Sequence, residues 1–98
     1  MIAFQIIAAV GTARSLYIEA IDLAADGKYD EARAKIEEGE ETFNTGHAAH
    51  GELLTQFANG ELPPMDILMT HAEDQLMSAE AFGILAKKFI TLYEKVNK

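Results

Sequence analysis

Four polar side chains interrupt an otherwise apolar stretch in the last third of the chain. They stand at positions i, i+3, i+4 and i+7 and are His71, Asp74, Gln75 and Ser78. A helix places this spacing on one face. A neutral imidazole is an abundant nucleophile near pH 7, and its nitrogen can accept a phosphoryl group and pass it on. His71 is therefore a candidate phosphoryl carrier, although a lone helical histidine is more often a structural residue whose hydrogen bonds are satisfied.

Asp74 has two alternative explanations on this face. A carboxylate on a partly apolar surface needs a cation or a proton, because burying it unpaired is costly. The first explanation is an ion pair with Arg14, which also interrupts an apolar stripe, and spacing alone favours it. The second is that copies of Asp74 meet on a symmetry axis, where a divalent ion neutralises their repulsion.

The other two histidines, His47 and His50, lie near the apolar seam of the middle segment. Their three-residue spacing has no carboxylate companion, so a histidine metal site is a remote alternative. The chain contains no Glu-x-x-His pair, no His-Glu-x-x-His motif, no P-loop and no glycine-rich dinucleotide loop. These absences exclude the usual dinuclear and nucleotide sites, so phosphate is not handled here as a bound nucleotide.

Composition restricts the class of protein further. Ninety-eight residues with no cysteine are expected to form one domain, residues 1–98, without disulfides or thiolate metal sites. Sixteen acidic against eight basic residues give a formal charge of −8, which argues against nucleic acid and anionic membranes as partners. The uncharged residues 1–13 are too few for a membrane span of about 20 residues, and no basic segment precedes them. We therefore expect a cytoplasmic protein with no membrane insertion.

Two breaks divide the chain into three helical segments, near residues 2–26, 30–59 and 65–97. Asp26-Gly27-Lys28 ends the first, because glycine accepts the left-handed conformation that closes a helix. Residues 59–64 (NGELPP) form the second break, since proline is tolerated only at the start of a helix.

Apolar residues in each segment recur at steps of four and three, which predicts long, nearly antiparallel helices. The expected fold is an all-α, antiparallel three-helix bundle. The first and third segments each carry two apolar stripes, more than one shared axis needs. Such surplus surface usually marks an interface, so we expect self-association along these two helices; the alternative is that wide stripes reflect close packing of alanines. Three glycines in the middle segment, Gly39, Gly46 and Gly51, indicate close backbone packing or a loosened turn.

Four stretches of this sequence together resemble a known protein family. Residues 69–77 (MTHAEDQLM) are similar to a His-[Ala/Gly]-Gln-Asp-His-Leu-Met segment, and residues 11–15 (GTARS) to Gly-x-Ala-Arg-Ser. Residues 44–47 (NTGH) resemble Asn-x-Ala-His, and residues 90–95 (ITLYEK) also fit. The family is the IIA components of the lactose/cellobiose (N,N'-diacetylchitobiose) branch of the bacterial phosphoenolpyruvate-dependent sugar phosphotransferase system.

The resemblance implies a concrete function. Members of this family are homotrimers of three-helix subunits, that is, nine-helix coiled-coil-like bundles. A histidine, which His71 matches, accepts phosphate from the phosphocarrier HPr and donates it to a IIB component. An aspartate, which Asp74 matches, lies at the trimer axis and binds one divalent metal, usually Mg. The resemblance thus reverses the preference for an Arg14 ion pair at Asp74.

The sequence departs from the family pattern around the candidate phosphoryl acceptor. Gln75 replaces a histidine, Glu73 replaces a glutamine, and the segment after His47 reads Ala-Ala-His50-Gly51. A carboxylate at Glu73 would repel a phosphohistidine, whereas His50 would compensate it as a cation. We therefore treat Gln75, Glu73, His50 and His47 as surrounding residues of the site. The alternative function is a divergent, non-catalytic trimeric bundle that serves as a regulator or scaffold.

Overall fold

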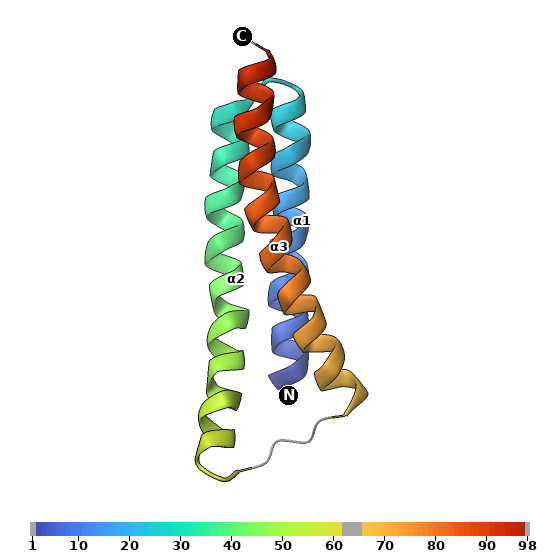
Figure 1. The fold of residues 1–98 in the computed structure, drawn as a ribbon, viewed down its shortest axis with the longest axis vertical. Helices are drawn as coiled ribbons and strands as arrows, with labels where there is room; N and C mark the ends of the chain where they lie inside the picture. Colours follow the sequence, from blue (N-terminus) through green and yellow to red (C-terminus); the bar gives the residue numbers. More distant parts are fainter. Residues whose placement is uncertain (1, 62–65, 98) are drawn as a thin grey trace.

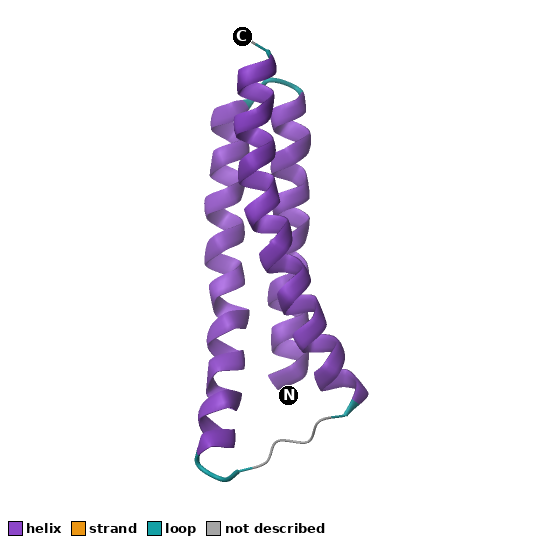
Figure 2. Ribbon diagram, viewed as in Figure 1, coloured by secondary structure: helices purple, strands orange, loops and turns teal. Residues whose placement is uncertain are grey.

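The computed structural model describes residues 2–61 and 66–97 and consists there of three α-helices (Figures 1 and 2). Helix α1 spans Ile2–Ala25, α2 spans Tyr29–Ala58 and α3 spans Ile67–Val96. They run up, down and up along a bundle of 55 × 21 × 17 Å. The predicted fold class and three segments are confirmed to within one or two residues; the expectations for Pro63, Pro64 and Met65 lie outside the described residues.

Both turns that end a helix contain a glycine, as the sequence predicts. Gly27 has φ of 79° and Gly60 has φ of 83°, a region that disfavours side chains with a Cβ atom. After α1, the backbone N–H of Lys28 donates to Leu23 O at 2.9 Å. After α2, the N–H of Glu61 donates to Gln56 O at the same distance. These bonds satisfy carbonyl groups that a helix end leaves without partners.

Helix α3 begins at a side-chain cap. Asp66 precedes the helix in an extended conformation, and its Oδ1 accepts a 2.9 Å hydrogen bond from the backbone N–H of Met69. This contact satisfies one of the free donors of the first turn. The cap therefore holds the start of α3 in a defined position, one turn before His71.

The buried core residues of α1 and α3 come alternately from the two apolar stripes of each helix, which begin at Ile2 and Ala3 in α1 and at Leu68 and Met69 in α3. In α1 the buried positions are Ala3, Ile6, Val10, Ala13, Tyr17, Ala20 and Ala24. In α3 they are Met69, Ala72, Leu76, Ala79, Gly83, Ala86 and Ile90. The expectation that one stripe packs and a separate stripe is surplus is therefore wrong in detail. Each outer helix packs against two neighbouring helices, so its buried face is centred between its two stripes. About half of the residues of each stripe are therefore buried.

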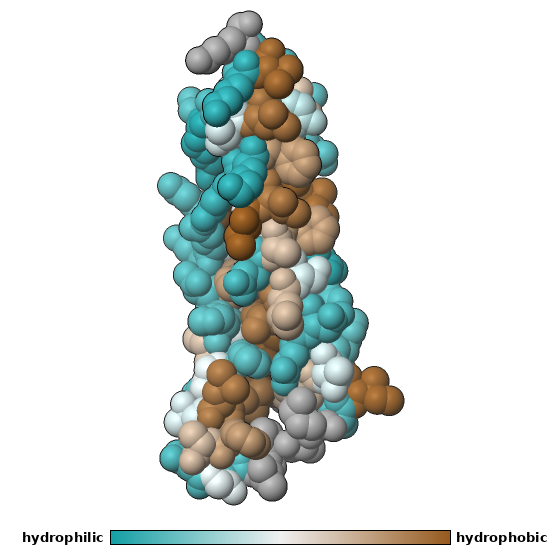
Figure 3. Space-filling model, in the orientation of Figure 1, coloured by the Kyte–Doolittle hydropathy of each residue, from teal (hydrophilic) through white to brown (hydrophobic). Residues whose placement is uncertain are grey.

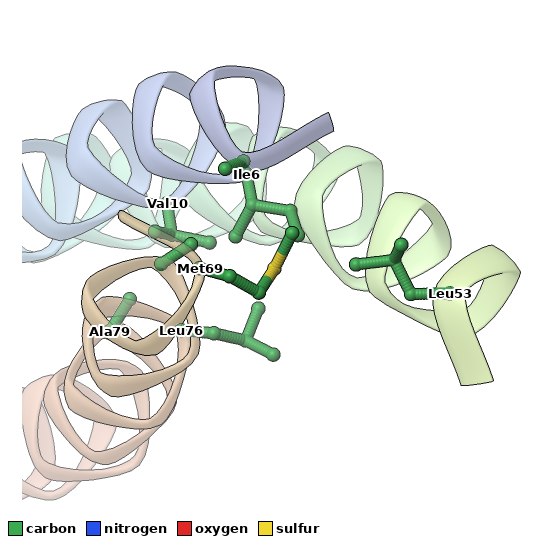
Figure 4. Close-up of a cluster of buried hydrophobic side chains, with 8 residues drawn as sticks. Ile6, Val10, Leu53, Met69, Leu76 and Ala79 are labelled. Atoms are coloured by element: carbon green, nitrogen blue, oxygen red, sulfur yellow. The ribbon is translucent and has the colours of Figure 1, made fainter. Parts of the chain in front are cut away.

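Two clusters of buried side chains follow one another along the bundle. In the lower cluster, Met69 of α3 lies between the side chains of Ile6 and Leu76, while Leu53 of α2 stands further off (Figure 4). The upper cluster is built around Tyr17 and many alanines. Close packing of alanines thus accounts for the buried part of the apolar stripes, which agrees with the alternative explanation for their width.

The Tyr17 ring fills a slot made by two glycines on the other helices. A Cβ atom added at Gly39 of α2 would lie 2.7 Å from Tyr17 Cε1, and one at Gly83 of α3 would lie 2.9 Å from Tyr17 Cε2. Both distances are too short for real side chains, so the ring leaves no room for one. The three helices therefore meet at Tyr17 in one register.

Burial of Tyr17 predicts an alkaline loss of stability. Burial, and secondarily the Glu40 carboxylate, raise the pKa of the Tyr17 hydroxyl above 10.0. Above pH 10 the unfolded chain releases this proton while the folded chain keeps it, so the free energy of unfolding must fall as pH rises. Urea unfolding between pH 9 and 11 should show this decline, and Tyr17→Phe should reduce its slope. An equal slope in both proteins would contradict the assignment.

Exposed apolar side chains follow the outer surface of the bundle. Most of the large ones lie on α3, which carries Ile67, Met77, Ile84, Leu85, Phe89, Leu92 and Val96. Figure 3 shows an apolar band along α3, whereas the visible surface of α2 is mainly hydrophilic. Two such residues, Phe4 and Ile18, lie on α1, and two, Leu54 and Phe57, near the end of α2. Exposed apolar surface is thus present on α1 and α3, the two helices for which the sequence predicts it, and most of it lies on α3.

No helix within residues 2–61 and 66–97 combines the length and apolar character needed to cross a membrane.

Candidate functional site

His71 lies on the outer surface of α3, one turn after the helix begins. Its side chain is exposed and borders a shallow depression whose other lining residues are Asp66, Ile67, Thr70 and Asp74. The predicted grouping of His71 with Asp74 is therefore present. A ring in this position is open to solvent and to a docking protein, while the backbone that carries it is held by a capped, packed helix.

Three methionines that lie near His71 in the sequence, Met65, Met69 and Met77, are expected to surround it on the helix. Met69 is only 6% exposed and packs in the lower core cluster, so its expected place beside His71 is wrong. Met77 is 70% exposed, whereas Met65 lies outside the described residues. Met69 is buried because it follows the core seam of α3 at a seven-residue distance from Leu76. The apolar surface near His71 comes instead from Ile67, which is 90% exposed.

Arg14 contacts the neighbour of Asp74 rather than Asp74 itself. Its Nη1 donates a 2.6 Å hydrogen bond to Gln75 Oε1, and both side chains are half-buried. The Arg14–Asp74 ion pair that spacing favoured is thus not the observed contact. Asp74 is exposed, because it lies on the side of α3 opposite the core, whereas Gln75 lies on the flank facing α1.

Glu73 lies on the other flank of α3 and faces α2. His50 Nε2 and Glu73 Oε2 are 3.9 Å apart, and the exposed fractions of the two side chains are 19% and 40%. When it is protonated, the His50 imidazole is therefore placed to compensate the negative charge of the Glu73 carboxylate. On a helix, residues two positions apart point in nearly opposite directions, so Glu73 points away from His71. The repulsion expected between Glu73 and a phosphorylated His71 is correspondingly weakened.

His47 belongs to a different surface. Its ring is exposed and stacks on Phe43, four residues earlier on α2, with ring centroids 6.0 Å apart and an interplanar angle of 20°. Among the residues that the structure describes, no group of three or more His, Asp or Glu side chains could hold a metal ion.

Two residues beside His71 were missed in the sequence. Asp66 and Thr70 both line its depression, and Thr70 Oγ1 donates to the Asp66 backbone carbonyl at 3.1 Å. An available signal was the aspartate that immediately precedes the apolar start of α3, which is typical of a helix cap. A cap and the residues one turn later share a helix end, so Asp66 and Thr70 could have been placed near His71.

The whole chain is similar in sequence to known proteins. A family profile described as "PTS system, Lactose/Cellobiose specific IIA subunit" matches residues 1–94. The lichenan-specific phosphotransferase enzyme IIA component of Bacillus subtilis is 40% identical over 97 residues, which cover 99% of this chain and 88% of that protein. The lactose-specific EIIA component of Staphylococcus epidermidis is 38% identical over 95 residues, covering 97% and 91%.

Solved structures agree with this relationship. The cellobiose-specific enzyme IIA from Bacillus anthracis superposes with a TM-score of 0.96 at 38% identity, over 98% of this chain and 88% of that one. PtcA from S. mutans gives a TM-score of 0.92 at 33% identity, over 95% and 91%. Sequence and fold therefore agree over almost the full length. The chain belongs to the lactose/cellobiose-specific IIA family of the sugar phosphotransferase system.

Proposed function

We propose that this protein is a cytoplasmic phosphoryl carrier in which His71 accepts phosphate from phospho-HPr and passes it to a IIB component. The sugars served are of the lactose, cellobiose or chitobiose type. Family membership supports the carrier role, and the relatives do not favour a non-catalytic scaffold. The observation that carries the choice of residue is the exposed imidazole of His71 at the rim of a depression on a rigid helix.

The surroundings of His71 suit transient docking. Ile67 of α3, which lines the same depression, is 90% exposed, and it offers apolar surface that a partner protein can cover. Contacts that must form and dissociate in each cycle are expected to be modest in area. A carrier needs this combination because its histidine has to meet two different proteins in turn.

Transfer to His71 needs no nucleotide. The lone pair of a neutral ring nitrogen of His71 attacks the phosphorus of the donor phosphohistidine, and an N–P bond forms. The N–P bond of the donor breaks, and its electron pair returns to the donor nitrogen. Each imidazole keeps its own N–H proton, so the step exchanges one phosphoryl group between two similar nitrogens. The near symmetry of donor and acceptor makes the transfer reversible.

The test is incubation of the purified protein with phosphoenolpyruvate, enzyme I and HPr. The protein should gain one phosphoryl group per chain, and the bond should be labile in acid and stable in alkali. Omission of HPr should prevent the gain. A protein that stays unphosphorylated in the complete mixture while HPr becomes phosphorylated would overturn the carrier role.

We further propose a homotrimer in which Asp74 from each copy meets the others around one Mg²⁺ ion. The apolar surface of α3 and α1 supports association of copies. The exposed Asp74 carboxylate offers the oxygen donors that magnesium prefers. The ion would neutralise three carboxylates that otherwise repel one another, and its role would be structural.

Removal of the ion should therefore weaken the assembly. We expect sedimentation equilibrium to give three times the chain mass, and EDTA to lower the Tm by about 5 °C or more at fixed protein concentration. Asp74→Asn should make the Tm insensitive to EDTA, because no carboxylates remain to be neutralised. Asp22→Asn, which removes an exposed carboxylate from α1, should keep the response. A monomeric mass would contradict the trimer, and a Tm unaffected by EDTA would contradict the ion.

A further inference from the structure

The polar contacts between α2 and α3 are unevenly distributed along the bundle. Within residues 2–61 and 66–97, the contact between His50 Nε2 and Glu73 Oε2, at 3.9 Å, is the one that lies near the end carrying His71. The other side-chain hydrogen bonds and ion pairs between these two helices join residues 29–40 to residues 87–97, at the opposite end. The His50–Glu73 pair therefore stands alone in linking the two helices where α3 begins.

Apolar packing between α2 and α3 is also sparse at this end. Of the described apolar side chains that are buried in the lower cluster, α2 supplies only Leu53, which stands apart from Met69 and Leu76 (Figure 4). Figure 1 shows α2 and α3 farther apart here than at the other end of the bundle. A region with few buried apolar contacts opens at a low cost in free energy, so a single polar link has a measurable effect there.

His50 is the member of the pair whose charge changes near neutral pH. An imidazole gains or loses its proton between pH 5 and 8, whereas a glutamate carboxylate stays ionised over most of this range. The sequence has no lysine or arginine between Lys35 and Lys87. A positive charge between α2 and α3 at this end must therefore come from a histidine.

The other ionisable groups around His50 leave Glu73 as its partner. Among the described residues, Glu73 is the acidic side chain within ion-pair distance of His50. Helix α1 carries no ionisable side chain before Arg14, which lies on the flank of α3 that faces α1. On α2 itself, His47 is exposed one turn earlier, and Glu52, two residues later, points in a nearly opposite direction.

We propose that His50 and Glu73 form a pH-sensitive link that closes the α2–α3 end of the bundle beside His71. Protonated His50 binds the Glu73 carboxylate and holds the first turns of α3 against α2. Neutral His50 gives up this ion pair, so the free energy of opening this end decreases as pH rises from 5.5 to 8.0. The link holds the segment that carries His71, but it does not depend on the proposed carrier function.

Amide hydrogen exchange of the full chain at pH 5.5 and 8.0 tests the link. Each exchange rate is divided by the intrinsic rate at the same pH, which leaves the protection due to structure. We expect the amides of residues 68–76 to be about two- to fivefold better protected at pH 5.5 than at pH 8.0. The amides of residues 86–94 should be equally protected at both, because the polar contacts of that end do not use histidine.

Matched variants assign the effect to the pair. His50→Gln and Glu73→Gln should each abolish the difference, whereas His50→Lys, which stays charged, should keep at pH 8.0 the protection found at pH 5.5. His47→Gln and His71→Gln should retain the difference, because neither removes a member of the pair. Equal protection of residues 68–76 at the two pH values in the wild type, or a difference that persists in His50→Gln, would overturn the proposal. No phosphate is used, so either result leaves the carrier function to its own test.

Discussion

His71→Gln is expected to take up no phosphate from phospho-HPr. Glutamine keeps a polar side chain of similar size at an exposed helical position, so the fold should be preserved. The variant lacks the ring nitrogen whose lone pair forms the N–P bond. Loss of a nucleophile usually costs more than about a thousandfold in rate, and label from phosphoenolpyruvate should therefore fall to the detection limit.

The two other histidines provide matched controls for this result. His47 stacks on Phe43, and His50 lies beside Glu73, so both have structural contacts that account for them. His47→Gln and His50→Gln should each accept one phosphoryl group per chain, with the acid lability of the wild-type bond. Phosphorylation that persists in His71→Gln and disappears in His47→Gln or His50→Gln would place the acceptor elsewhere. Circular dichroism should confirm that all three variants are folded.

Gly83→Ala is expected to destabilise the bundle even though alanine favours helices more than glycine does. The added methyl group would lie 2.9 Å from the Tyr17 ring, and Gly39 blocks retreat of the ring towards α2. Overpacking of this kind costs about 1–3 kcal/mol, and the helix preference of alanine returns about 1 kcal/mol. Chemical unfolding should show a net loss of up to about 2 kcal/mol. Gly39→Ala should behave in the same way.

Two other helical glycines should respond in the opposite direction. A Cβ atom added at Gly11 or Gly51 would meet nothing within 4 Å, so Gly11→Ala and Gly51→Ala should each stabilise the fold by about 1 kcal/mol. Unfolding must be measured at one protein concentration, because association of copies would add to the apparent stability. Equal effects of Gly83→Ala and Gly51→Ala would show that the Tyr17 slot is not tight.

The sequence predicts the helices and their ends because both depend on residues that are close together in the chain. Gly27 and Gly60 end two helices through a backbone conformation that other residues disfavour. The spacing of His71 and Asp74 sufficed to place them together on the outer surface of α3. The expectation of close packing at the glycines of α2 is confirmed at Gly39, where Tyr17 packs, and at Gly46, where Val10 packs, while Gly51 has open space beside it.

Contacts between helices were decided only by the tertiary structure. Arg14 binds Gln75 and not Asp74, and Met69 is buried in the core although it lies only two residues from the exposed His71. Both outcomes depend on the rotation and the axial register of one helix against another. The helical period specifies which residues share a face, but a face is wide enough for several residues to meet the same partner. Packing of the Tyr17 ring between Gly39 and Gly83 sets that register, so the sequence determined the helices and their faces, and the packed bundle decided which side chains meet.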